Sequence, residues 1–169
     1  MPLLPCSGAL PESNWPGSAA TSTASRVRTP APVPSAQRAQ RGVIDTSVVI
    51  DLEQLDARQL PIELAVSAIT MAELAAGPHA TDDAEERARR QDRLQRAEAA
   101  FDPLPFDGEA ARAYGRIYAA EVASGRKARG ARAPDLLIAA TACAAGLPVY
   151  TRNPEDFQGI QGLVDVFGV

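Results

Sequence analysis

Residues 43–169 alternate short apolar runs with longer helical segments, and this alternation constrains the fold more than any other feature of the chain. Four short apolar runs predict strands, over 42–45, 64–69, 147–151 and 163–167. Five segments between them predict helices, over 46–55, 71–77, 81–100, 109–124 and 135–145. Strands that alternate with helices form a parallel sheet with helices on both faces. The sequence therefore predicts an α/β fold, a three-layer α/β/α sandwich around a short, mostly parallel sheet.

Residues 1–42 differ from the rest of the chain in composition and in pattern. They contain seven of the fourteen prolines and six serines, and no apolar period runs through them. Such a segment cannot bury enough apolar surface to offset the entropy lost on ordering. We therefore predict that 1–42 is a disordered Pro/Ser-rich N-terminal extension and that 43–169 is the folded domain. The folded pattern begins abruptly at Val43, and bacteria also start translation at valine codons, so a misassigned start codon is a second interpretation of the extension.

The charges of the predicted domain restrict how it can bind nucleic acid. Residues 43–169 contain 20 acidic and 13 basic residues, whereas 1–42 contain one acid and four arginines. A domain this acidic does not bind nucleic acid through a broad basic face. Clustered carboxylates suit hard cations instead, and with a phosphodiester substrate those cations must bridge the like charges.

Acidic residues stand at the points where the predicted strands end. Asp45 ends the first strand, Glu73 follows the second, Asp135 opens the last long helix, and Asp156 lies three residues after Asn153 beyond the third strand. In parallel α/β folds, ligands bind outside the carboxyl ends of the strands. Carboxylates gathered there repel one another unless a divalent cation neutralises them. The pattern predicts a Mg²⁺ or Mn²⁺ site suited to phosphodiester hydrolysis.

Each acid also has a structural interpretation. Thr70 and Glu73 match the capping-box spacing at a helix start, and Asp45 could cap the first helix. Asp135 near a helix N-terminus favours the helix dipole, and Asp156 could stabilise a turn. The joint pattern of the four favours the metal site more than any one of them does.

Two hydroxyl residues and one basic loop accompany the acids. Thr46 and Ser47 follow Asp45 directly, and they could support a metal ligand, cap the helix, or do both. The loop before Asp135 contains the densest basic run of the domain, formed by Arg126, Lys127, Arg129 and Arg132. Two interpretations of this run are equally supported: contact with backbone phosphates of a nucleic acid beside the metal site, or a solvated surface loop.

Other active-site types find little support in the sequence. There is no Walker-type or dinucleotide-binding glycine motif and no zinc-ligand spacing, and the single histidine, His79, falls in a loop. A receiver domain needs a lysine at a late strand end, and Lys127 does not stand there. A haloacid-dehalogenase-like phosphatase needs a second Asp two residues after Asp45, where this chain has Ser47.

Four sequence blocks together resemble the PIN domain, and specifically the VapC-type toxins. The blocks are 43–47, 67–74, 134–140 and 151–157, and their order and spacing match over 43–169. The resemblance implies an α/β/α sandwich that is a Mg²⁺- or Mn²⁺-dependent endoribonuclease. It also implies a homodimer and a cognate VapB-like antitoxin that blocks the site.

The resemblance assigns roles to individual residues. Asp45, Glu73 and Asp135 match the metal-binding acids of the family. Many relatives have Asp where Asn153 stands, so either Asn153 or Asp156 supplies the last ligand, and action with one metal is favoured.

The sequence thus predicts an endoribonuclease that acts as the toxin of a toxin–antitoxin pair. The alternative is a catalytically weak PIN-like module that acts by binding protein or RNA. With no apolar stretch long enough for a membrane span and no secretory signal pattern, we expect a cytoplasmic protein. The sequence indicates neither which RNA is cleaved nor which antitoxin is the partner.

Overall fold

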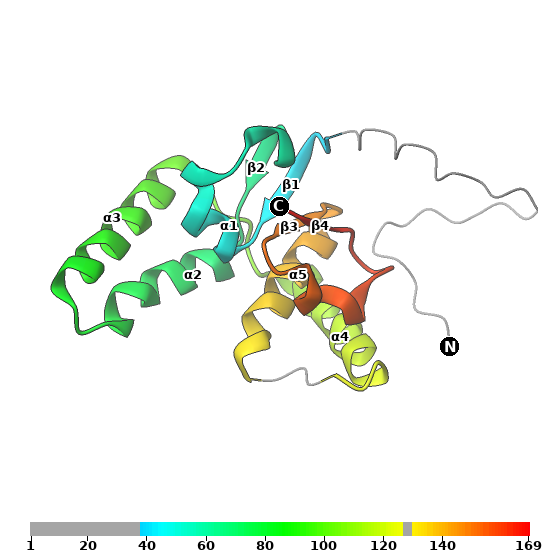
Figure 1. The fold of residues 1–169 in the computed structure, drawn as a ribbon. Helices are drawn as coiled ribbons and strands as arrows, with labels where there is room; N and C mark the ends of the chain where they lie inside the picture. The colour runs from blue at the N-terminus through cyan, green and yellow to red at the C-terminus, as the bar shows by residue number, and fades with distance from the viewer. Residues whose placement is uncertain (1–37, 127–129) are drawn as a thin grey trace, which may run out of the picture. The chain divides into compact units, whose positions relative to one another are not determined.

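A four-stranded parallel sheet forms the centre of the molecule (Figure 1). The computed structural model describes residues 38–126 and 130–169. The strands are β1 (Arg41–Ile44), β2 (Glu63–Ala65), β3 (Val149–Thr151) and β4 (Val166–Gly168). They are hydrogen-bonded in the order β2-β1-β3-β4, and every neighbouring pair is parallel. The predicted short parallel sheet is confirmed.

Helices and short 3₁₀ turns connect the strands. The α-helices are α1 (Thr46–Asp51), α2 (Ala68–Ala76), α3 (Ala84–Ala100), α4 (Gly108–Ala123) and α5 (Ala133–Ala145). The 3₁₀ turns are η1 (Leu52–Gln54), η2 (Ala57–Gln59), η3 (Gly77–Ala80), η4 (Gly130–Arg132) and η5 (Pro154–Ile160). Within the described residues, no helix has both the length and the apolar character that crossing a membrane requires.

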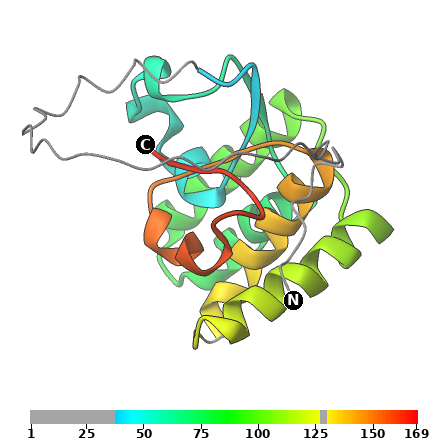
Figure 2. The same cartoon turned by 90° about the vertical axis from the view of Figure 1, so that its right-hand side faces the viewer.

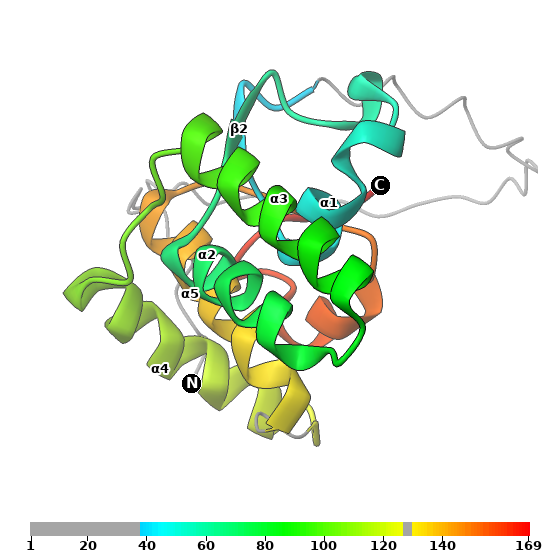
Figure 3. The same ribbon diagram turned by 90° about the vertical axis from the view of Figure 1, so that its left-hand side faces the viewer.

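Neighbouring residues of the central strands face opposite cores. Val43 and Val149 pack with apolar residues of α4 and α5, the helices that stand in front in Figure 2. Ile44 and Tyr150 pack with residues of α1, α2 and α3, and Figure 3 shows α3 in front on that side. Because side chains of a strand alternate between its two faces, each strand contributes to both cores. The predicted three-layer α/β/α sandwich is therefore confirmed.

The sheet includes residues that the sequence analysis assigned to the extension. β1 begins at Arg41. Upstream of it, Arg38 donates from Nε to the carbonyl of Leu60 at 2.7 Å, and the Ala39 carbonyl accepts from the amide of Ile62 at 3.1 Å. Backbone pairing thus continues before Val43, where the apolar pattern starts. The predicted disorder of the preceding residues, 1–37, lies outside the described residues.

Two predicted elements are shorter than expected, each for a local reason. The strand predicted over 64–69 ends at Ala65, because the Ser67 hydroxyl accepts the amide of Thr70 at 3.0 Å and caps α2. The helix predicted over 46–55 ends at Asp51 and continues as the tighter η1 turn. A last turn of this kind is common where an α-helix ends.

Candidate metal centre

Asp45 lies directly after β1 and is almost completely buried. Its Oδ1 accepts hydrogen bonds from the Val48 amide at 3.0 Å and the Ser47 hydroxyl at 2.7 Å. Its Oδ2 accepts from the Thr151 hydroxyl at 2.6 Å. Donors from α1 and from β3 therefore hold the carboxylate in place, so the predicted helix-cap role is confirmed.

The hydroxyls of Ser47 and Thr151 join the end of β3 to the start of α1. Besides donating to Asp45, Ser47 Oγ accepts from the Arg152 amide at 3.1 Å, and Thr151 Oγ1 accepts from the Asn153 amide at 3.0 Å. Thr151 is fully buried, and the sequence analysis did not single it out. The sequence shows only a hydroxyl residue at the end of the third predicted strand, and the pairing of that strand with β1 follows from the structure.

Glu73 lies on α2 and contacts Thr46 across the edge of the site. The Thr46 hydroxyl donates to Glu73 Oε2 at 2.5 Å. The capping-box interpretation of Glu73 is wrong, because Ser67 caps α2 and Thr70 stands inside the helix. Glu73 is therefore not needed for the helix start, and it is held instead by a residue adjacent to Asp45.

Asp135 is in the first turn of α5 and is partly buried. Its pKa is raised from 3.8 to about 7, first by burial and then by the negative charges of Asp156, Glu73 and Asp45, while Arg132 acts in the opposite direction. A carboxyl group resists ionisation when it is desolvated and other carboxylates lie nearby. The four acids that the sequence analysis selected thus share one electrostatic neighbourhood.

Asp156 lies in η5, and Arg132 holds this turn through two contacts. Arg132 Nε is 3.9 Å from Asp156 Oδ1, and Arg132 NH2 donates to the Asp156 backbone carbonyl. Asn153 precedes η5, is exposed, and makes no side-chain hydrogen bond that caps the turn. Of the two candidate fourth ligands, Asp156 is the one whose charge acts on Asp135.

The basic loop before α5 is anchored by a buried acid that the sequence analysis missed. Glu121 of α4 is fully buried, and its Oε2 lies 3.3 Å from Arg132 NH1 and 3.5 Å from Arg126 Nε. Neither Glu121 oxygen has a hydrogen-bond partner among the described residues, so these ion pairs offset its charge. Because Glu121 shares the buried side of α4 with apolar residues, its position gave no signal of a polar contact.

Of the four basic residues predicted to contact phosphates, the structure describes Arg126 and Arg132. Arg126 donates to the Glu155 carbonyl at 2.7 Å, so both Arg126 and Arg132 are engaged with Glu121 and with the backbone of η5. Lys127 and Arg129 lie outside the described residues. Contact of any of the four with RNA stays a prediction.

The donor set fits a hard divalent cation by its chemistry. In residues 38–126 and 130–169, no three histidine, cysteine, aspartate or glutamate side chains are arranged to hold a metal ion as they stand. The acids nevertheless come from the residue after β1, from α2, from α5 and from η5, and they supply only oxygen ligands, which Mg²⁺ and Mn²⁺ prefer. Their mutual repulsion at Asp135 is the penalty that a cation would remove.

Fold and site together define a class of protein: a parallel α/β sandwich with carboxylates gathered where the strands end. The chain belongs to the PIN-domain family, whose model matches residues 42–162. The resemblance found in the four sequence blocks is therefore confirmed. As a group, PIN-domain ribonucleases depend on divalent metal ions.

Named relatives agree with this assignment. The chain is 38% identical over 128 residues to ribonuclease VapC5 of Mycobacterium tuberculosis, which covers 74% of this chain and 91% of that protein. It is 31% identical over 129 residues to ribonuclease VapC1 of Rickettsia felis, covering 72% of this chain and 91% of that protein.

Solved structures of similar proteins share the fold. The VapBC-5 structure from Mycobacterium tuberculosis, a member of the VapBC family of toxin–antitoxin systems, matches with a TM-score of 0.67 and 36% identity, over 77% of this chain and 99% of that chain. The FitAcB structure from Neisseria gonorrhoeae matches with a TM-score of 0.57 and 28% identity, over 75% of this chain and 96% of that chain.

The hydrogen bond from Thr151 to Asp45 yields a prediction on metal affinity. Thr151→Val keeps the shape of the side chain but removes the donor, so Mn²⁺ binding to the full chain weakens by roughly 10- to 100-fold in calorimetry. The matched control is Thr141→Val, a buried threonine whose hydroxyl donates to the Leu137 carbonyl inside α5 at 3.0 Å. Equal Mn²⁺ affinities of the two variants would contradict the role given to Thr151.

The raised pKa of Asp135 yields a prediction on stability. Between its ordinary pKa of 3.8 and about 7, the folded metal-free protein binds more protons than the unfolded chain, so this group lowers stability as pH rises. The penalty is absent below this window and complete above it. Asp135→Asn removes the penalty, so in urea denaturation with EDTA the variant exceeds the wild type at about pH 8 and matches it near pH 4. A stability difference independent of pH would show that ionisation of Asp135 is not its cause.

Proposed function

We propose that this protein is a Mg²⁺- or Mn²⁺-dependent endoribonuclease and the toxin of a type II toxin–antitoxin pair. The observation that carries the proposal is the placement of acids from separate elements around Asp135, whose pKa is raised first by burial and then by the charges of Asp156, Glu73 and Asp45. Repulsion between carboxylates destabilises a site without a cation, whereas a bound divalent cation removes the repulsion and favours the ionised acids. Membership of the PIN-domain family and similarity to named ribonucleases support the same activity.

Asp45, Glu73 and Asp135 are the residues that would hold the ion. When bound, a divalent cation polarises a phosphoryl oxygen and lowers the pKa of water at the site, so that hydroxide is available at neutral pH. Asp156 adds negative charge beside Asp135 and is the better candidate for a fourth ligand. Asn153 is the other candidate.

The chain's own residues prepare the carboxylates for this task. Thr151 and Ser47 fix the orientation of Asp45, and Thr46 fixes that of Glu73. Asp135 is partly protonated near neutral pH in the metal-free protein, and it releases that proton when a cation takes its place. Arg132 holds η5 so that Asp156 stays beside α5.

The partners proposed for this chain follow from its relatives. Its substrate is RNA, as the ribonuclease names of the curated relatives indicate for those proteins. A cognate VapB-like antitoxin that covers the site, a homodimeric toxin and a cytoplasmic location complete the proposal. The VapBC-5 structure, described as a member of a toxin–antitoxin family, supports the antitoxin.

Metal-dependent cleavage of RNA by the purified full chain is the experiment that tests this function. We expect cleavage of single-stranded RNA with Mg²⁺ or Mn²⁺ and none in EDTA. Asp45→Asn and Asp135→Asn each lower kcat/KM by at least about 100-fold, because each removes a ligand carboxylate. Asp82→Asn, which alters an exposed carboxylate ahead of α3, is the matched control and keeps full activity.

Two results would count against the proposal in different ways. Undiminished cleavage in EDTA would exclude metal-dependent hydrolysis. Binding of Mn²⁺ and RNA without any cleavage would favour the alternative function, a PIN-like binding module.

A further inference from the structure

A cavity of about 310 Å³ lies beside the candidate metal centre, between α1, α2 and α3. Thr46 and Glu73, which are hydrogen-bonded to each other, form the side of the cavity next to the acids. The remaining lining residues are Ile50, Leu74, Gly77, Glu86, Arg90 and Arg93. A volume at the lower end of the range for ligand pockets suits one nucleotide rather than a long segment.

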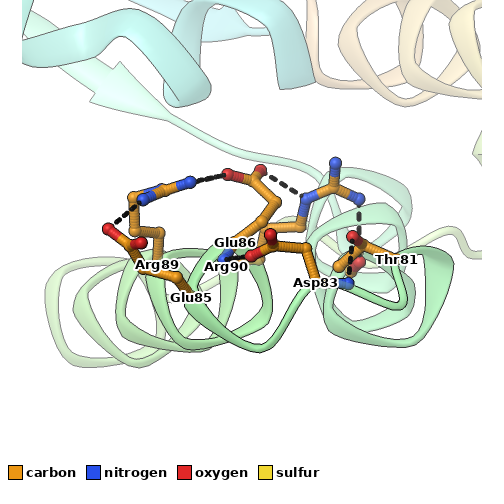
Figure 4. Close-up of polar contacts among 7 residues, drawn as sticks. Thr81, Asp83, Glu85, Glu86, Arg89 and Arg90 are labelled. Carbon is orange, nitrogen blue, oxygen red and sulfur yellow. Dashed lines mark hydrogen bonds and ion pairs between the residues drawn. The ribbon is translucent and has the colours of Figure 1, made fainter.

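Arg90 is a fixed part of the cavity wall. Its Nε donates to Glu86 Oε1 at 2.7 Å, and its NH1 donates to the carbonyl of Gly77 at the end of α2 at 3.0 Å. Glu86 also accepts from Arg89 Nε at 3.0 Å, and Figure 4 shows its carboxylate between the two arginines. These ion pairs hold Arg90 in place on α3, and its hydrogen bond to Gly77 connects α3 to the end of α2.

Arg93, one turn further along α3, differs from Arg90 in its lack of polar contacts with the described residues. It lines the same cavity and is partly buried. Among the described residues, its guanidinium makes no hydrogen bond and no ion pair, although the nearby Arg89, Arg90 and Arg96 all pair with acids. An arginine offers five N–H donors in a fork that matches phosphate oxygens. An unpaired guanidinium on a cavity wall is therefore available to an anion.

Ile50 gives the cavity an apolar surface beside that cation. Ile50 is 43% exposed, so its apolar surface is accessible from the cavity. Ile50 and Arg93 also both line a second cavity of about 270 Å³ between α1 and α3, so the two cavities adjoin. Exposed apolar surface next to a phosphate-binding group suits a nucleotide, because its sugar and base can pack where its phosphate is paired.

We propose that this cavity binds the nucleotide adjacent to the scissile phosphate of the RNA, with Arg93 pairing with its phosphate and Ile50 packing against its sugar or base. The inference rests on the proposed ribonuclease function and adds a substrate subsite to it. The cavity shares Thr46 and Glu73 with the candidate metal centre, so a nucleotide next to a phosphate held at the acids is within reach of it. An acidic peptide from a protein partner could also pair with Arg93, and the test below separates the two.

The experiment compares two arginines on the same helix. Arg93→Ala removes the proposed phosphate contact, and Arg93→Lys keeps the charge but loses the fork. Arg87→Ala is the matched control: it removes the same charge from an exposed arginine that donates to the Thr81 carbonyl and does not line the cavity. Alanine favours helices, so α3 persists in all alanine variants, which circular dichroism melting verifies.

The readout is binding of a fluorescein-labelled pool of single-stranded RNA of randomised sequence, measured by anisotropy with Mn²⁺ present. The full chain carries Asp45→Asn so that the RNA stays intact. We expect Arg93→Ala to weaken binding about tenfold and to reduce the slope of log affinity against log salt by about 0.7. Arg93→Lys weakens binding less, and Arg87→Ala leaves both affinity and slope near those of the parent.

Equal affinities and slopes for Arg93→Ala and Arg87→Ala would overturn the RNA subsite and would favour an acidic peptide of a protein partner as the occupant. Cleavage of the same RNA pool by the wild-type chain in Mn²⁺ is measured in parallel. If the wild type cleaves while the two alanine variants bind alike, only the subsite is refuted. If the wild type does not cleave, the proposed function fails and the subsite falls with it.

Discussion

The carboxylate of Asp45 is the point at which the sheet, the first helix and the candidate site are joined. It follows β1 directly, caps α1 by accepting from the Val48 amide, and accepts from the Thr151 hydroxyl of β3. A buried carboxylate without such donors would incur a large desolvation penalty. The three hydrogen bonds offset that penalty, so Asp45 is held in a single orientation at the carboxyl edge of the sheet.

The remaining acids are arranged around this fixed point under mutual repulsion. The effect is seen at Asp135, where burial first, and then the charges of Asp156, Glu73 and Asp45, raise the pKa to about 7. The positive charge of Arg132 offsets part of this repulsion. Glu121, which is buried on α4, in turn pairs with Arg132. The site therefore favours a bound positive charge. The function proposed above uses this same electrostatic imbalance.

The layers and the acidic residues were predictable from sequence because both depend on local patterns. Alternating strand and helix signals dictate a parallel sheet, and residues that follow its strands converge on one edge. Asp45, Glu73, Asp135 and Asp156 were selected on that ground. Element ends were less predictable: the second strand stops early because Ser67 caps α2, a contact that competes with extending the strand.

Residues that act through distant partners could not be found in this way. Thr151 and Glu121 matter through contacts with Asp45 and Arg132, and those contacts depend on how separate elements pack. Gly42 is a similar case, because a Cβ there would come within 2.6 Å of the Tyr150 ring on the neighbouring strand. A sequence pattern shows which residues share a face, but the partner across the sheet or between helices follows only from the folded structure.

Anomalous X-ray scattering from crystals of the full chain grown with Mn²⁺ tests the metal centre most directly. The account predicts a manganese peak bounded by Asp45, Glu73 and Asp135, about 2.1 Å from their carboxylate oxygens. A peak elsewhere on the molecule, with none between these three carboxylates, would contradict it.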